Sequence, residues 1–405
     1  MSTLADTPLA TDFPCLRREG IVYLDSAATS QTPQPVIDAM ADYYEAHRGT
    51  VHRSVYALAA EATELFESAR DRIAAFVNWP ANCTIFTKNA TEALNLVAYS
   101  WGRANVGRGD RVVVTQLEHH SNFVPWHVLC EATGAQFEMV EVDDDATLRL
   151  DQLDELLSTG TVKLVAVGHV SNAAGTVNDV AEVVRRAHAA GAVVVVDGSQ
   201  AVPQLPVDLA ALDADFYAWT GHKLYGPTGV GVLHGRKSLL DAMPPFLGGG
   251  HMIASVSVDE IRFGQLPAKF EAGTSNIAEA IGLGAAVDFV SAIGMESIRE
   301  HERDLAAYAL DRLAELPDVT VMGPLEADRR GALVAFTLDI AHPHDIAEIL
   351  GSSGVCVRAG HHCAQPLMQR FGVAATTRAS FAVHNTRADV DRLIDGLNDV
   401  RKIFG

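Results

Sequence analysis

The sequence predicts an α/β fold with a large domain on a mostly parallel sheet, followed by a smaller α+β domain. Apolar runs alternate with amphipathic helical patterns from about Ile21 to Gly294, which is typical of a parallel sheet with helical connections. The run Ala192–Val196 is apolar on both faces, so helices are expected to cover both sides of the sheet. The chain has 405 residues, which suits two packed domains better than one small core.

The apolar runs place the strands of the large domain, and amphipathic patterns place helices at Glu61–Phe76, Ala181–Ala190 and Ile277–Ile293. The expected strands are Ile21–Leu24, Thr84–Thr87, Arg111–Thr115, Lys163–Val167, Ala192–Val196, Asp215–Trp219 and Val230–His234. We expect residues 21–294 to form this domain, after an N-terminal segment, residues 1–20, that packs with the small domain.

The small domain is expected to span residues 295–405. Its patterns predict helices and strands in mixed order, which indicates an α+β arrangement. In chain order the elements are helix Met295–Leu316, strands Val319–Met322 and Leu333–Leu338, helix His344–Ser352, strands Val355–Arg358 and Ala379–Val383, and helix Arg387–Ile403.

Composition excludes several classes of protein. Lys and Arg number 31 and Asp and Glu number 51, so the net charge of −20 argues against nucleic acid and anionic membranes as partners. No segment approaches the ~20 consecutive apolar residues of a membrane span, and the first residues lack the features of a secretory signal. The five cysteines have no metal-ligand spacing, so we expect no metal site, a reducing cytoplasm and at least one free thiol.

A buried strand ends at Asp197, and a later strand delivers Thr220, Gly221, His222 and Lys223. Ligands of open α/β sheets bind beyond the carboxyl ends of strands. Alone, Asp197 would pass for a turn residue and Lys223 for a surface charge. Together they suit pyridoxal 5′-phosphate (PLP), which needs a lysine amine for its Schiff base and an acid for its pyridine nitrogen.

Two further segments could complete such a site. Asn89–Glu92 lies between a strand and a helix, where backbone N–H groups and the Thr91 hydroxyl could bind a phosphate; an ordinary N-cap is equally consistent. His119 and His120 are adjacent and cannot share a face, so one could stack on a flat ring while the other packs or caps. A zinc site lacks partners at ligand spacing.

The segment around Cys363 carries the third candidate group. Cys363 follows a strand and a glycine turn, with Arg358, His361 and His362 nearby, and positive neighbours favour the reactive thiolate. A core thiol remains the alternative. Cys356 lies in an apolar strand and is expected to be inert and buried. Downstream, Arg378 opens a strand, where it could bind a carboxylate or serve in an ion pair.

The motifs occur in an order that resembles a known family. LDSAAT, VHRSVY, NATEALNLVA, EHHSNFVPW, HVSNAAGT, VDGSQAV, TGHKLYGPTG, FEAGTSN and RAGHHCAQPL resemble the group II, SUF-type cysteine desulfurases of the class V aminotransferases. The resemblance covers nearly the whole chain. It implies a fold-type I PLP homodimer that converts L-cysteine to L-alanine, leaves a persulfide on a cysteine and supplies sulfur for iron–sulfur cluster assembly.

The resemblance also implies roles for individual residues. Lys223 would form the Schiff base, Cys363 would accept the sulfur, and His120 would stack on the ring and shuttle protons. The remaining cofactor ligands would be Asp197, Gln200, Thr91, Thr220, His222 and, from the neighbouring subunit, Thr274. Substrate would be bound by Arg378 and Asn172, with His52, Arg53 and Arg358 lining the entrance.

The cysteine loop is short, which in the family goes with dependence on a partner: a sulfur-acceptor protein of the SufE or SufU kind and a SUF scaffold complex. Ala90 and Thr220 depart from the commonest pattern without removing a reactive group. Three alternatives remain: a selenocysteine lyase; another class V reaction, such as an aminotransferase, epimerase or kynureninase-like enzyme, which would not need Cys363; and a catalytically silent scaffold, which would not need Lys223 and Asp197.

Overall fold

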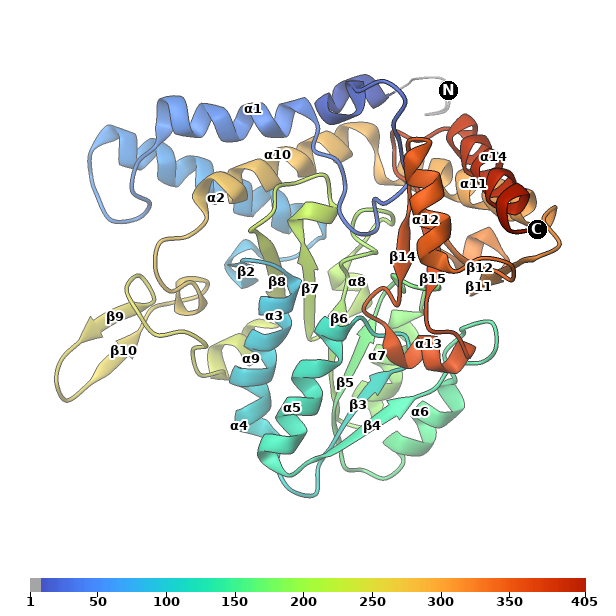
Figure 1. The fold of residues 1–405 in the computed structure, drawn as a ribbon. Helices are drawn as coiled ribbons and strands as arrows, with labels where there is room; N and C mark the ends of the chain where they lie inside the picture. Colours follow the sequence, from blue (N-terminus) through green and yellow to red (C-terminus); the bar gives the residue numbers. More distant parts are fainter. Residues whose placement is uncertain (1–8) are drawn as a thin grey trace.

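A seven-stranded sheet forms the centre of the large domain in the computed structural model, which describes residues 9–405 (Figure 1). Its strand order is β2-β8-β7-β6-β5-β3-β4. The neighbouring strands from β7 through β6, β5 and β3 to β4 pair in parallel. β8 runs antiparallel to both of its neighbours, β2 and β7. The strands are β2 (Thr84–Thr87), β3 (Arg111–Thr115), β4 (Gln136–Val140), β5 (Val162–Gly168), β6 (Val193–Asp197), β7 (Phe216–Thr220) and β8 (Gly231–Gly235). The predicted α/β class is confirmed.

Helices cover both faces of this sheet, as the two-sided apolar strands predict. Val194 of β6 packs in one buried cluster with α2, α7 and α10, whereas its neighbour Val195 packs in another with α3 and α5. The helices of the large domain are α1 (Gln34–Asp42), α2 (Ala57–Phe76), α3 (Ala90–Val97), α4 (Arg103–Asn105), α5 (Val124–Thr133), α6 (Leu150–Leu157), α7 (Val180–Ala189), α8 (Leu209–Leu212), α9 (Lys237–Ala242) and α10 (Ile277–Ile293).

The second sheet has the order β11-β12-β15-β14 and is antiparallel throughout. A separate parallel pair joins β1 to β13. The small domain contains α11 (Met295–Ala314), β11 (Val319–Met322), β12 (Leu333–Leu338), α12 (Pro343–Ser352), β13 (Val355–Cys356), β14 (Arg358–Gly360), α13 (Gln365–Phe371), β15 (Thr376–Ser380) and α14 (Arg387–Phe404).

Two strand predictions are wrong. The expected strand Ile21–Leu24 is β1 (Val22–Tyr23), which pairs with β13 of the small domain and not with the large sheet. The last strand lies at Thr376–Ser380 rather than Ala379–Val383, so Arg378 sits in its middle. All of its residues are buried although all but Ala379 are polar, and a search for apolar runs passes over such a strand.

The N-terminal segment bridges both parts of the chain. Phe13 is fully buried, and its ring packs against Tyr225 and Phe289 of the large domain and against His384 of the small one. The predicted packing of residues 1–20 with the small domain therefore leaves out the contact of Phe13 with the large domain. Residues 1–8 lie outside the described part. We retain Gly294, between α10 and α11, as the proposed domain boundary.

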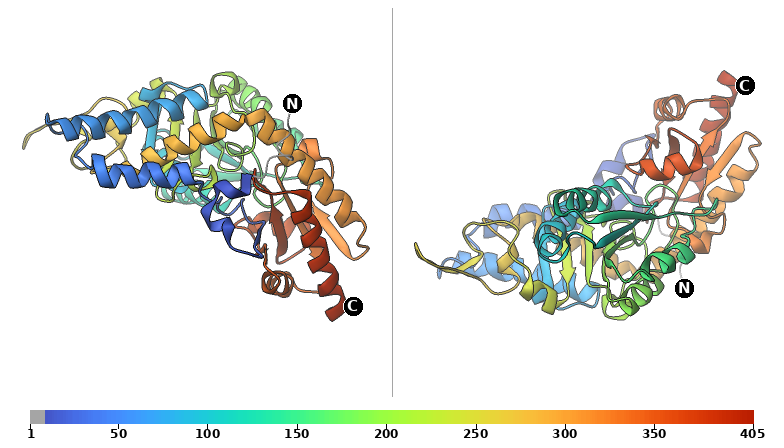
Figure 2. Two further views of the ribbon diagram at one scale, coloured as in Figure 1. Left: turned by 90° about the horizontal axis from the view of Figure 1, so that it is seen from above. Right: turned by 90° about the horizontal axis from the view of Figure 1, so that it is seen from below.

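One element projects from the body. The hairpin of β9 (Ile253–Val256) and β10 (Ile261–Phe263), which the sequence did not indicate, extends at the opposite end of the molecule from the small domain (Figures 1 and 2). No single helix within residues 9–405 has the length and apolarity of a membrane span. The α10–α11 pair meets those two criteria jointly, with a bend of 76° between its helices.

Candidate active site

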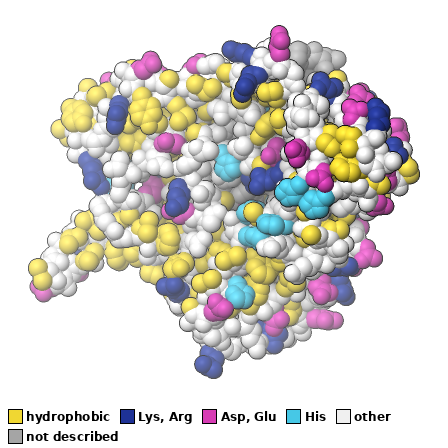
Figure 3. All heavy atoms as spheres, in the orientation of Figure 1, with side chains coloured by type: hydrophobic (Ala, Val, Ile, Leu, Met, Phe, Trp, Pro, Cys, Tyr) yellow, Lys and Arg dark blue, Asp and Glu magenta, His cyan; other side chains and the backbone are white. Residues whose placement is uncertain are grey.

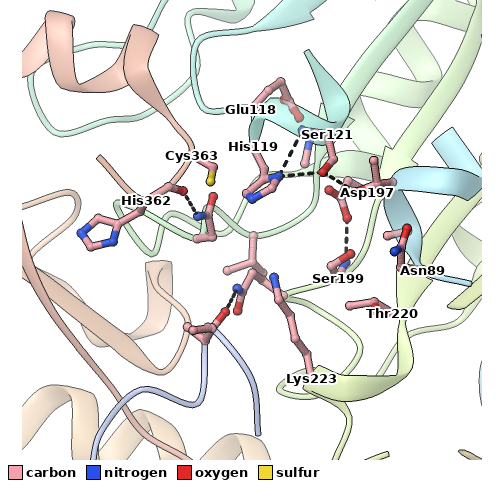
Figure 4. A pocket seen from close by; sticks show the side chains of 18 of the residues that line it. Asn89, Glu118, His119, Ser121, Asp197, Ser199, Thr220, Lys223, His362 and Cys363 are labelled. Atoms are coloured by element: carbon pink, nitrogen blue, oxygen red, sulfur yellow. Dashed lines mark hydrogen bonds between the residues drawn. The ribbon is translucent and has the colours of Figure 1, made fainter. Parts of the chain in front are cut away.

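A cavity of about 250 Å³ opens where β5, β6 and β7 end and the small domain begins. Both domains contribute to its wall, and Lys223 and Cys363 approach it from different sides (Figure 4). Of the residues predicted for the site, ten line this one cavity: Thr91, Asn172, Asp197, Gln200, Thr220, His222, Lys223, Arg358, Cys363 and Arg378.

Asp197 and Lys223 follow adjacent parallel strands. Asp197 is the last residue of β6, only 9% exposed, and its Oδ1 accepts a hydrogen bond from the Ser199 N–H at 2.9 Å. The next residue must be glycine, because a Cβ at Gly198 would lie 2.0 Å from the Tyr217 ring. Burial lowers the pKa of Lys223 to about 8, although the charge of Asp197 acts in the opposite direction. Such an amine is partly neutral, and hence nucleophilic, near neutral pH.

Hydroxyl groups gather on the cavity wall near the start of α3. Asn89 caps this helix by accepting a hydrogen bond from the Glu92 N–H at 2.9 Å. Thr91 Oγ1 lies 2.7 Å from Ser121 Oγ. The hydroxyls of Thr220 and Ser199 are buried with no hydrogen-bond partner in the described chain. A helix N-terminus surrounded by hydroxyls is an anion site.

The two histidines separate as expected, but the resemblance assigned the ring-stacking role to the wrong one. His119, not His120, lines the cavity and points into it (Figure 4). The Nδ1 of His119 accepts a hydrogen bond from the Ser121 N–H at 3.1 Å, which leaves the ring proton on Nε2. Burial, and then the charge of Lys223, lower the pKa of His119 to about 4, so the ring is neutral near pH 7. His120 begins the 3₁₀ turn after His119 and packs instead against His361, with ring centroids 5.6 Å apart.

Glu118 is a buried residue of the cavity wall that the sequence reasoning missed. Its carboxyl group accepts hydrogen bonds from Thr115 Oγ1 at 2.6 Å, from Asn122 Nδ2 at 2.6 Å and from the Gly168 N–H at 2.9 Å. It thereby joins the end of β3, the histidine turn and the end of β5. Burial raises the pKa of Glu118 to about 8. Glu118 could have been found from the sequence, because it is an acidic residue inside an otherwise apolar and histidine-rich segment.

Cys363 lies on the loop between β14 and α13 and is partly exposed. His362 and Cys363 both have positive φ, 50° and 56°, a conformation that costs a non-glycine residue about 1 to 2 kcal/mol. Burial lowers the pKa of His362 to about 3, so this ring is neutral and is not the positive neighbour expected from sequence. Cys356 is only partly buried, contrary to prediction, although burial does raise the pKa of its thiol.

Arg378 of the small domain forms a hydrogen bond to Asn172 of the large domain. Arg378 Nη1 donates to the Asn172 carbonyl at 2.8 Å, and Nη2 donates to Asp25 at 3.1 Å. Arg378 Nε is buried with no partner in residues 9–405, so its N–H is left without an acceptor. The Asn172 side chain donates to the His362 carbonyl at 2.6 Å and thus supports the cysteine loop. Asp25, in the motif LDSAAT, was not predicted as a site residue.

Three predicted residues lie away from this cavity. His52, Arg53 and Thr274 are exposed and absent from its wall. His52 Nε2 lies 3.0 Å from a carboxylate oxygen of Glu67. Thr274 lines a separate cavity of about 240 Å³. Within one chain, therefore, two of the three expected entrance residues, His52 and Arg53, do not meet the expected catalytic ones, whereas Arg358 does. No group of three or more His, Cys, Asp or Glu among residues 9–405 is arranged to hold a metal ion.

PLP fits the groups that do meet. The cavity offers an amine at Lys223, a buried carboxylate at Asp197, unpartnered hydroxyls at Thr220 and Ser199, and a flat ring at His119. These are the chemical groups that the Schiff base, the pyridine nitrogen, the phosphate and the ring face of PLP require.

Known proteins resemble this chain in sequence and in fold. Residues 22–393 match the family model described as aminotransferase class-V. A probable cysteine desulfurase of Streptomyces coelicolor is 50% identical over 99% of both chains, and a cysteine desulfurase of Haloferax volcanii is 48% identical over 95% of this chain and 90% of that protein.

Two solved structures superpose over nearly the whole chain. The apo cysteine desulfurase of Thermococcus onnurineus NA1 is 39% identical with a TM-score of 0.95 over 99% of both chains. The Escherichia coli cysteine desulfurase CsdA, in an S-sulfonic acid form, is 38% identical with a TM-score of 0.92 over all of both chains. With its family match and these identities, the chain belongs to the class-V aminotransferase family.

Proposed function

We propose that this protein is a PLP-dependent cysteine desulfurase that converts L-cysteine to L-alanine and keeps the sulfur as a persulfide on Cys363. The observation that carries the proposal is that Lys223, Asp197 and Cys363 line one cavity. Other class V reactions would use the first two residues but have no need of a thiol opposite the lysine. The names of the relatives agree with this activity.

The chain's own groups would bind both molecules. Bound PLP supplies an electron sink next to the substrate α-carbon. Asp197 would keep its pyridine nitrogen protonated, Gln200 would meet the ring hydroxyl, and His119 would lie against the ring. The phosphate ligands would be Thr91, Thr220 and His222. Arg378, with Nε unpartnered, would bind the substrate carboxylate.

The sulfur transfer then needs a nucleophile and a proton carrier. The Cys363 sulfur attacks the substrate sulfur, a new S–S bond forms, and the C–S bond of the substrate breaks. The electron pair of that bond stays with the amino-acid fragment. Lys223 Nζ or His119 Nε2 delivers the proton that completes alanine. Arg358, which is exposed on β14 and lines the same cavity as Cys363, would lie at the approach to the thiol.

We assign His52, Arg53 and Thr274 to the cavity of a partner subunit in a homodimer. The three lie on adjoining segments: a Cβ at Gly250 would meet the Arg53 guanidinium at 3.1 Å, and the Gly250 carbonyl accepts from the Gly273 N–H at 2.9 Å. His52 lies beside His251 in the same region, with ring centroids 5.3 Å apart. Sedimentation of the holoenzyme should show a dimer, and a fully active monomer would contradict the assignment.

The same proposal includes a cytoplasmic location and delivery of the persulfide sulfur to a SufE-like or SufU-like acceptor and a SUF scaffold. The partial exposure of Cys363 beside the exposed His361 supports transfer to a docked protein.

The decisive experiment compares wild type with Cys363→Ser, supplying L-cysteine and a reductant. Wild type should release alanine and sulfide, and mass spectrometry without reductant should find one added sulfur atom on the peptide that contains Cys363. The variant should bind PLP but release no alanine, because a serine hydroxyl has neither the acidity nor the affinity for sulfur. Alanine release at the wild-type rate by the variant, or sulfur on another cysteine, would refute the mechanism.

A further inference from the structure

The Cys363 loop adopts two consecutive left-handed conformations without glycine, at His362 and Cys363. Such a conformation persists only where surrounding contacts impose it. Two buried contacts hold His362: the Asn172 side chain donates to the His362 carbonyl, and His362 Nε2 lies 2.9 Å from Thr376 Oγ1. Neither reaches the backbone of Cys363 itself.

Two histidines that lie outside the cavity wall hold that backbone. The Cys363 N–H donates to His361 Nδ1 at 3.0 Å, and the Cys363 carbonyl accepts from the His120 N–H at 2.7 Å. The Gln365 N–H, at the start of α13, donates to His120 Nε2 at 3.3 Å. The two rings lie against each other at 5.6 Å with an interplanar angle of 35°. Several histidine side chains are exposed on the face of the molecule that Figure 3 shows.

We propose that His120 and His361 are positioning residues that form a latch on the Cys363 loop, and that the two hydrogen bonds to their ring nitrogens hold only while the rings are neutral. In two of the three hydrogen bonds, from the Cys363 N–H to His361 Nδ1 and from the Gln365 N–H to His120 Nε2, a ring nitrogen is the acceptor, so these two need neutral imidazoles. A protonated ring would present N–H to N–H, whereas the bond from the His120 backbone N–H to the Cys363 carbonyl does not depend on the rings. The proposal rests on the assignment of Cys363 as sulfur acceptor and explains how its thiol is kept in one position while the loop stays near the surface.

Two of the histidines around this pair stay neutral over the pH range in which the latch is expected to change. Titratable or charged neighbours are His119 on the same turn, Arg358 on β14, and His362 with Cys363 on the loop. His119 and His362 have pKa values lowered to about 4 and about 3, chiefly by burial, so both stay neutral above about pH 5. Burial and His361 lower the pKa of His120. The Gln365 bond to His120 is therefore formed above the usual histidine pKa of about 6.5 and is lost as the pH falls through the lowered pKa of His120.

Hydrogen exchange of the full-length, PLP-loaded protein without substrate tests the latch. At about pH 8 the Cys363 and Gln365 amides should be protected, and the protection, corrected for intrinsic exchange, should fall roughly fivefold by about pH 5. His361→Ala should lower protection of the Cys363 amide similarly at both pH values, and His120→Ala should do so for Gln365. His361→Asn and His120→Gln place an oxygen near the lost acceptor nitrogen, so each should restore protection and abolish its pH dependence.

Amides of β6 and the variant His127→Ala, an exposed histidine on α5, serve as controls and should be unaffected. Unchanged protection in both alanine variants would overturn the proposal, and so would an unaltered pH dependence in His361→Asn and His120→Gln. Because exchange is measured without turnover, a negative result here is distinct from failure of the alanine assay, which would instead refute the proposed function.

Discussion

The two sides of the cavity are built in different ways. Asp197 ends the buried strand β6 and Lys223 ends the 3₁₀ turn that follows β7, and the parallel pairing of these two strands brings both residues to the same edge of the sheet. Cys363 stands on a loop with two left-handed residues, which contacts from Asn172, His120 and His361 hold in place. The cofactor side is thus determined by regular structure, and the thiol side by a few specific hydrogen bonds.

The largest expected effect lies on the cofactor side. Lys223→Ala should abolish alanine formation and covalent capture of PLP, because the cavity then lacks its amine nucleophile. Visible absorbance and reduction with borohydride followed by mass spectrometry measure the loss. A variant that keeps the wild-type absorbance band and a reducible cofactor would show that another amine carries PLP.

A smaller loss should follow from Asp197→Asn. The fold should persist, because the Ser199 N–H can still donate to the amide oxygen, but turnover should drop about a hundredfold or more, since a neutral amide cannot hold the pyridine nitrogen protonated. Steady-state alanine release gives the rate, and circular dichroism checks the fold. Turnover within about twofold of wild type would return Asp197 to the role of a turn residue.

The two adjacent histidines can be separated by spectroscopy. His119→Ala should shift the absorbance of bound PLP and reduce turnover by roughly a hundredfold, because the ring against the cofactor and its proton on Nε2 are lost. His120→Ala should leave the absorbance of bound PLP in place, since His120 is not part of the cavity wall. The reverse pattern would restore the assignment made from the motif and contradict the structure.

The mildest test varies only pH. In the PLP-free protein, the rate of PLP capture should rise with pH and reach half its maximum at about 8, where Lys223 loses its proton, rather than near the ordinary lysine value of 10.5. The sign follows from chemistry: the neutral amine attacks, so capture increases as the ammonium form disappears. A midpoint near the ordinary lysine pKa would mean that burial does not perturb this amine.

Much of the fold was predictable because it is local. Apolar runs marked β2, β3, β11 and β12 at their observed bounds and α10 as well, and the turns after β6 and β7 carried Asp197 and Lys223. Buried strands and amphipathic helices leave a periodic pattern in the chain. β4 and the β9–β10 hairpin, which are only partly buried or exposed, leave a weaker pattern and were missed.

By itself, the sequence determined the α/β class, the strand ends that carry the site, and a set of reactive residues that includes Lys223, Asp197 and Cys363. Only the tertiary structure decided that His119 rather than His120 faces the cavity, that β1 pairs with β13, and that Thr274 lies apart from Lys223. The reason is physical. Helix and strand periodicity act between near neighbours, whereas side-chain direction in a turn, and pairing between segments hundreds of residues apart, depend on long-range packing.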